Sequence, residues 1–88
     1  FAQSVFAKMQ EGVDVTSIRR YLIENEARYG KDYHGLLREL FNVIEASKVS
    51  EDKKRKFLII LAEHMYRHVS VMDPEINAYV AIVNMMDV

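Results

Sequence analysis

Hydrophobic positions along this chain of 88 residues recur at helical spacing in five segments. Apolar residues three, four and seven positions apart lie on one face of an α-helix, whereas a half-buried strand alternates apolar and polar residues. Asp32 is the expected N-cap of the clearest segment. Gly35 inside this segment costs about 1 kcal/mol relative to alanine, which indicates close packing or a slightly later helix start. The segment follows the helical template without a miss, at Tyr33, Leu36, Leu37, Leu40, Phe41 and Ile44.

Two shorter helices are expected before this segment, and each ends at a glycine, Gly12 or Gly30. Asp14 or Thr16 is the expected N-cap of the second. We expect the inward positions to be Val5, Phe6 and Met9 in the first helix, and Val15, Ile18, Tyr21 and Leu22 in the second.

Two further helices are expected in the C-terminal half of the chain. Ser50 is a suitable N-cap for a helix from about Glu51 to Val69 or beyond. Its apolar run, Phe57–Ala62, predicts the central and most buried element. Asp73, Pro74 and Glu75 form a strong start signal for the last helix, as cap, first helical residue and first-turn acid. We expect its inward positions to be Ile76, Tyr79, Val80, Val83 and Met85 or Met86.

Five helices without an alternating strand pattern or an internal repeat predict an all-α fold, a compact bundle forming one domain over residues 1–88. Half of the residues are hydrophobic and 28% are charged, a composition typical of globular proteins. No apolar run approaches the roughly 20 residues that a membrane-spanning helix needs. The lack of cysteine excludes disulfides and thiolate metal sites, and favours a reducing compartment, the cytoplasm or the nucleus. Because Phe1 already lies inside an amphipathic pattern, we interpret the chain as a C-terminal fragment of a longer protein.

Candidate catalytic chemistry is sparse. The sequence has no phosphate-binding loop and no nucleophile in a glycine-flanked turn. His64 and His68 lie four residues apart and could face one metal ion, but zinc needs a third protein ligand, from His34, Asp73 or Glu75. We favour two partly exposed histidines near a helix C-terminus, and we expect no catalytic, cofactor-binding or metal-ligating residue in this fragment.

Basic residues are concentrated in the run Lys53, Lys54, Arg55 and Lys56, and in the pair Arg19 and Arg20. Such clusters can meet DNA phosphates or an acidic protein surface. Since the net charge is −1, a solubilising face is the favoured interpretation, and a binding patch stays open as the alternative.

The apolar content is high for so small a core, with five methionines, five tyrosines and four phenylalanines. Methionine side chains fill irregular gaps and also recur on helix surfaces that pack against partners. If the last helix carries Tyr79, Ile82 and Met85 on the face opposite Val80 and Val83, that face is too apolar for a free surface, and we expect a neighbouring subunit to cover it.

Two stretches, Leu58–Arg67 and Asp73–Asn77, resemble the C-terminal collar domain of clamp-loader small subunits, the replication factor C small subunits of archaea and eukaryotes and their phage counterparts. Ile18–Leu22 and Leu36–Phe41 fall where that family has its second and third collar helices. The turn Val69–Met72 lacks the glycine usual in the family, which favours a phage or otherwise divergent member. The positions that carry the resemblance are Ala62, Glu63, Tyr66, Arg67, Asp73, Glu75, Ile76 and Asn77.

The resemblance implies an oligomerisation domain without an ATP site of its own. Clamp loaders are five-subunit AAA+ ATPases that open a ring-shaped sliding clamp and place it on primer-template DNA, and their collars hold the pentamer together. ATP and magnesium would bind elsewhere in the parent protein, and the partners of this fragment would be other clamp-loader subunits. The candidate subunit contacts are Tyr66, Arg67, Tyr79, Arg19 and Arg20. The alternatives are a generic helical protein-interaction or DNA-binding module and, last, a small metal-dependent enzyme.

Overall fold

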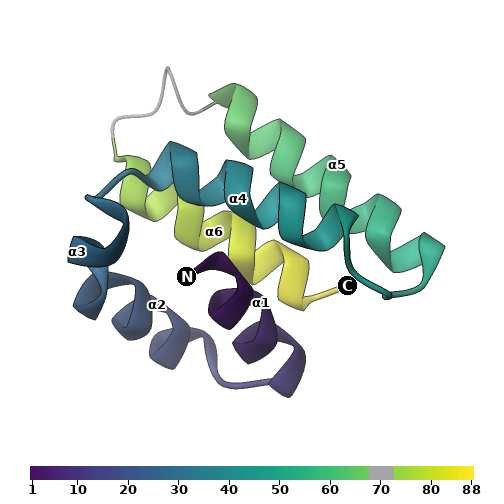
Figure 1. The fold of residues 1–88 in the computed structure, drawn as a ribbon, viewed down its shortest axis with the longest axis horizontal. Helices are drawn as coiled ribbons and strands as arrows, with labels where there is room; N and C mark the ends of the chain where they lie inside the picture. The colour runs from purple at the N-terminus through teal and green to yellow at the C-terminus, as the bar shows by residue number, and fades with distance from the viewer. Residues whose placement is uncertain (68–72) are drawn as a thin grey trace.

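Six α-helices make up the described part of the chain, residues 1–67 and 73–88, in a computed structural model (Figure 1). No strand occurs in these residues, so the predicted all-α bundle is confirmed. The helices are α1 (Ala2–Glu11), α2 (Val15–Glu24), α3 (Glu26–Tyr29), α4 (Tyr33–Glu45), α5 (Glu51–Arg67) and α6 (Pro74–Met86).

Polar side chains start the helices largely where the sequence predicts. The carboxylate of Asp14 accepts a hydrogen bond from the Ser17 N–H at 3.1 Å, so Asp14 rather than Thr16 caps α2. Ser50 Oγ accepts from the Lys53 N–H at 3.3 Å at the start of α5. The Asp73 carboxylate accepts from the first backbone N–H groups of α6, and Pro74 occupies the first turn, where a missing N–H costs nothing.

Two glycines end helices in the left-handed conformation that the pattern predicts, Gly12 with φ 77° and Gly30 with φ 62°. Gly35 has a different reason to be glycine. Asp32 caps α4 by accepting from the Gly35 N–H at 2.8 Å, and a Cβ at Gly35 would lie 2.8 Å from Asp32 Cγ. The cap and a side chain at position 35 therefore compete for the same space.

The second predicted helix is wrong in one respect, because the chain breaks it at Asn25 into α2 and α3. The Asn25 side-chain amide donates to the Tyr21 carbonyl at 2.8 Å, and the Asn25 backbone N–H turns to Leu22. An asparagine side chain thus takes the carbonyl that an uninterrupted helix would offer to the backbone.

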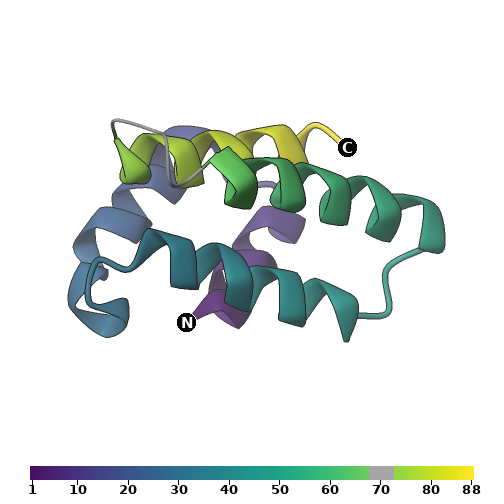
Figure 2. The same cartoon turned by 90° about the horizontal axis from the view of Figure 1, so that it is seen from above.

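The core forms around α4, which packs against α1, α5 and α6. In Figure 1, α4 lies in front of α5 and α6, and Figure 2 shows α5 and α6 together on the side of the molecule opposite α4. The fully buried side chains from this centre and its neighbours include Val5, Ile18, Leu22, Leu36, Leu37, Leu40, Ile44, Leu61, Ile82 and Met85.

The prediction that the helix beginning at Glu51 is the most buried element is wrong. In α5 only Phe57, Leu61 and His64 are buried, and Ile59 in its apolar run is 52% exposed. The reason is that α5 packs by one face on α4 and α6 and leaves the opposite face to solvent. The predicted continuation of this helix to Val69 lies outside the described residues.

Most of the predicted inward positions of the last helix are also wrong. Ile76 is 45% exposed and Val80 is 39% exposed, while Tyr79 and Val83 are half-buried. Of the expected positions only Met85 is buried. The buried face of α6 consists of Asn77, Ala78, Ala81, Ile82 and Met85. The expectation that a neighbouring subunit covers the face with Ile82 and Met85 is therefore wrong, because both side chains pack in the core of the domain itself.

Candidate interaction surface

One face of α6 is apolar and points away from the core. We call Ile76, Tyr79, Val80 and Val83 the α6 outer face, since these residues repeat at spacings of three and four and none is fully buried. A surface helix normally has an apolar stripe on one side and polar residues on the other. α6 carries apolar residues on both sides, so one apolar face stays exposed in the single chain.

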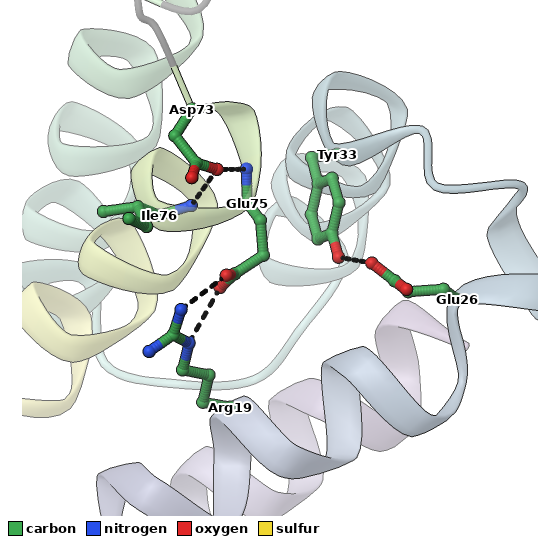
Figure 3. A network of polar contacts seen from close by, with 6 residues as sticks. All are labelled: Arg19, Glu26, Tyr33, Asp73, Glu75 and Ile76. Carbon is green, nitrogen blue, oxygen red and sulfur yellow. Dashed lines mark hydrogen bonds and ion pairs between the residues drawn. The ribbon is translucent and has the colours of Figure 1, made fainter.

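Arg19 of α2 borders this face (Figure 3). Its guanidinium donates two hydrogen bonds to the Glu75 carboxylate, from Nη2 to Oε1 at 2.7 Å and from Nε to Oε2 at 3.1 Å. The same guanidinium lies 5.4 Å from the centre of the Tyr79 ring, within cation–π distance. The hydrogen bond to Glu75, with the charge of that carboxylate, raises the pKa of Arg19. Ile23, exposed one turn further along α2, lines a shallow hollow with Arg19 and Arg20.

A buried polar pair fixes the start of α6 against α5. Asn77 Nδ2 donates to the His64 carbonyl at 3.0 Å, and Asn77 Oδ1 lies 2.9 Å from His64 Nδ1. The bond from Nδ2 fixes the orientation of the Asn77 amide, so the atom that faces the His64 ring is the amide oxygen. An amide oxygen can only accept a hydrogen bond, and His64 Nδ1 therefore carries the proton. His64 is buried, and the expectation that it is partly exposed is wrong.

His64, one of the candidate metal ligands, has its Nδ1 in the hydrogen bond with Asn77. Within residues 1–67 and 73–88, no three histidine, aspartate or glutamate side chains are grouped as metal ligands. The other candidates have separate structural contacts: Asp73 caps α6, and Glu75 holds Arg19. His68 lies outside the described residues.

The predicted subunit contacts fall into two groups. Arg19, Tyr79 and Arg67 lie at the α6 outer face, whereas Tyr66 and Arg20 are exposed elsewhere on α5 and α2. Arg67 lies at the end of α5 and lines a hollow of about 360 Å³ with Ile76 and Val80, so it borders the α6 outer face opposite Arg19. Arg67 also pairs with Glu63 at 3.9 Å. Tyr66 is 84% exposed on α5. Arg20 is exposed on α2, next to Ile23 in a shallow hollow.

The basic run does not form one cationic patch. Successive helical residues point about 100° apart, so Lys53, Lys54, Arg55 and Lys56 surround the start of α5. Lys54 Nζ donates to the Glu45 carbonyl at 3.1 Å, and Lys56 pairs with Asp52 at 3.2 Å. These contacts favour the interpretation of a solvated helix start.

An aromatic cluster near the Arg19–Glu75 bridge has no counterpart among the predicted sites (Figure 3). The Phe1 ring stacks on Tyr21 and Tyr29 at centroid distances of 5.2 and 5.1 Å. Tyr33 lies edge-on to Tyr29, and its hydroxyl donates to Glu26 (Figure 3). Burial, and then the Glu26 hydrogen bond, raise the pKa of Tyr33. The periodicity predicts inward positions at Tyr21 and Tyr33 but carries no signal of ring-to-ring contact.

No family model, curated protein or solved structure matches this chain. Among the helices of residues 1–67 and 73–88, none combines the length and apolar character required to cross a membrane. The interpretation of the surface therefore depends on its own geometry.

Proposed function

We propose that this domain is an oligomerisation module that joins subunits of the same kind through the α6 outer face. The observation that carries the proposal is the apolar character of α6 on both sides, with one side packed on the core and the other exposed. Covering exposed apolar area is favourable by roughly 25 cal/mol per Å² before the cost of association is subtracted.

The rigidity of the face supports this proposal. Its first turn is held by the Asp73 cap, by the buried His64–Asn77 pair and by the Arg19–Glu75 bridge. A preformed surface loses little conformational freedom when a partner packs on it, so more of the burial energy contributes to affinity. A helix of a neighbouring subunit is the complementary shape, because side-chain ridges of one helix fit the grooves of another.

The resemblance to clamp-loader small subunits gives this proposal a specific form. We propose the collar of such a subunit, which holds an ATPase pentamer together in the cytoplasm or nucleus. ATP, magnesium, the sliding clamp and primer-template DNA would then be bound by other parts of the parent protein. Reading the coding sequence upstream of Phe1 tests this form, since a G-x-x-x-x-G-K-[ST] loop is expected there, and its absence would exclude the clamp-loader assignment.

Substitution of Val80 by aspartate tests the surface itself. A carboxylate in a covered apolar contact must lose its hydration without a partner, so we expect self-association to weaken by about 30-fold or more, equivalent to roughly 2 kcal/mol. Sedimentation equilibrium over a concentration series measures the association constant, and circular dichroism checks the fold.

Ala7→Asp on α1 is the matched control, because it adds the same charge at another exposed helical position. We expect this variant to associate like the unmodified chain. Equal association of the Val80→Asp variant and the control would refute the α6 outer face as the interface.

A further inference from the structure

The bridge between Arg19 and Glu75 connects two helices whose main neighbours differ. α2 packs mainly against α1 and α3, whereas α6 packs mainly against α4 and α5. The two residues are 56 positions apart in the chain, and the contact is bidentate, with both carboxylate oxygens used. In Figure 3 the Arg19 side chain extends from α2 toward the first turn of α6, where Glu75 meets it.

The two side chains of the bridge differ in solvent exposure. The Arg19 side chain is 43% exposed, but the Glu75 side chain is only 17% exposed. Glu75 lies next to Ile76, at the edge of the α6 outer face. When a partner covers that face, Glu75 loses most of its remaining contact with water, whereas Arg19 already neutralises its charge.

We propose that Arg19 is a positioning residue for the interaction surface, and this inference rests on the proposed function. Arg19 compensates the carboxylate at the edge of the contact before a partner arrives. Its guanidinium also lies 5.4 Å from the centre of the Tyr79 ring, at the edge of the α6 outer face. A partner therefore meets a surface on which Glu75 is already paired and does not have to supply a cation for it.

This role makes the effect on association larger than the effect on folding. In the free domain Arg19 is 43% exposed and Glu75 still reaches water, so a Glu75 left without Arg19 keeps part of its hydration, and losing the pair costs less than it would in a covered interface. Removing Arg19 should therefore change the unfolding equilibrium by about fivefold or less. In the assembled state the same change leaves a carboxylate covered without its partner, which is much more costly, so association should weaken by about 30-fold.

The two-residue comparison tests this mechanism directly. Arg19→Gln should weaken self-association strongly, and the double variant Arg19→Gln/Glu75→Gln should recover most of the loss because no lone carboxylate remains. Lys56→Gln is the control, since it removes an ion pair with Asp52 on the exposed start of α5. Association is measured by sedimentation equilibrium, and stability by urea unfolding of the same samples.

The outcomes separate this inference from the proposed function. A strong loss in Arg19→Gln with recovery in the double variant supports the positioning role. If Val80→Asp disrupts association but Arg19→Gln behaves like Lys56→Gln, or if the double variant does not recover, the positioning role is wrong and the interface stands. If the unmodified chain is monomeric throughout, or if Val80→Asp has no effect, the proposed interface fails and this inference fails with it.

Discussion

Replacing Asn77 by alanine should destabilise the domain more than any surface substitution on α6. The change removes two hydrogen bonds to His64, of 2.9 and 3.0 Å, each contributing about 1 kcal/mol. It also leaves the His64 Nδ1–H, in a buried ring, without its partner, at a further cost of about 1 kcal/mol. The total of about 3 kcal/mol is a large fraction of the roughly 4–13 kcal/mol expected for a domain of 88 residues.

Urea unfolding followed by circular dichroism at the helical band measures this loss. The corresponding fall in Tm is about 12–24 °C for a domain of this size. Asn42→Ala, at an exposed asparagine of α4, is the matched control and should change stability by less than about 0.5 kcal/mol.

A double variant tests whether the loss of stability comes from the buried His64 N–H that is left without a hydrogen-bond partner. Replacing both partners, as His64→Leu with Asn77→Leu, should cost at least about 1 kcal/mol less than the sum of the two single substitutions. A loss below about 1 kcal/mol for Asn77→Ala, or strict additivity in the double variant, would refute the reasoning.

Two further predictions concern the N-terminal half. Gly35→Ala should leave stability nearly unchanged, because the helix-propensity gain of about 1 kcal/mol is cancelled when the new Cβ displaces the Asp32 cap. In an Asp32→Ala background the same substitution should stabilise by about 1 kcal/mol in urea unfolding, and equal effects in both backgrounds would contradict this competition. Burial raises the pKa of Tyr33, so the folded state favours the neutral hydroxyl. The contribution of Tyr33 to the free energy of unfolding is therefore fully present below the unfolded tyrosine pKa of about 10 and is lost as the pH rises above that value. Tyr33→Phe should therefore move the midpoint of alkaline unfolding to higher pH, and ionisation of Tyr33 in the folded chain near the ordinary tyrosine pKa of about 10, seen by ultraviolet absorbance, would count against it.

Local signals account for most helix ends in this protein. Asp14, Asp32 and Asp73 cap helices because each carboxylate reaches backbone N–H groups only two or three residues away. The break at Asn25 is also local, but it was missed because helical periodicity continues across it, and only the side-chain bond to the Tyr21 carbonyl reveals it.

The choice between the two faces of α6 required the tertiary structure. Periodicity predicts an inward stripe only when the opposite face is polar, and both faces of this helix are apolar. The chain buries Ala78 and Ala81, whose small side chains suit close helix packing, and turns Ile76 and Val80 outward. The same limit explains the wrong prediction for α5, whose apolar run does not reveal that only one side is packed.

Contacts between distant segments were equally beyond the sequence pattern. His64 and Arg19 could be selected as chemically interesting side chains, but their partners, Asn77 and Glu75, depend on how α5 and α2 lie against α6. The sequence by itself determined the helical class, most helix boundaries and the excess of apolar surface, since these follow from interactions within a few residues. The tertiary structure alone decided which apolar face remained exposed and which charges were paired, because burial and pairing depend on the packing of helices far apart in the chain.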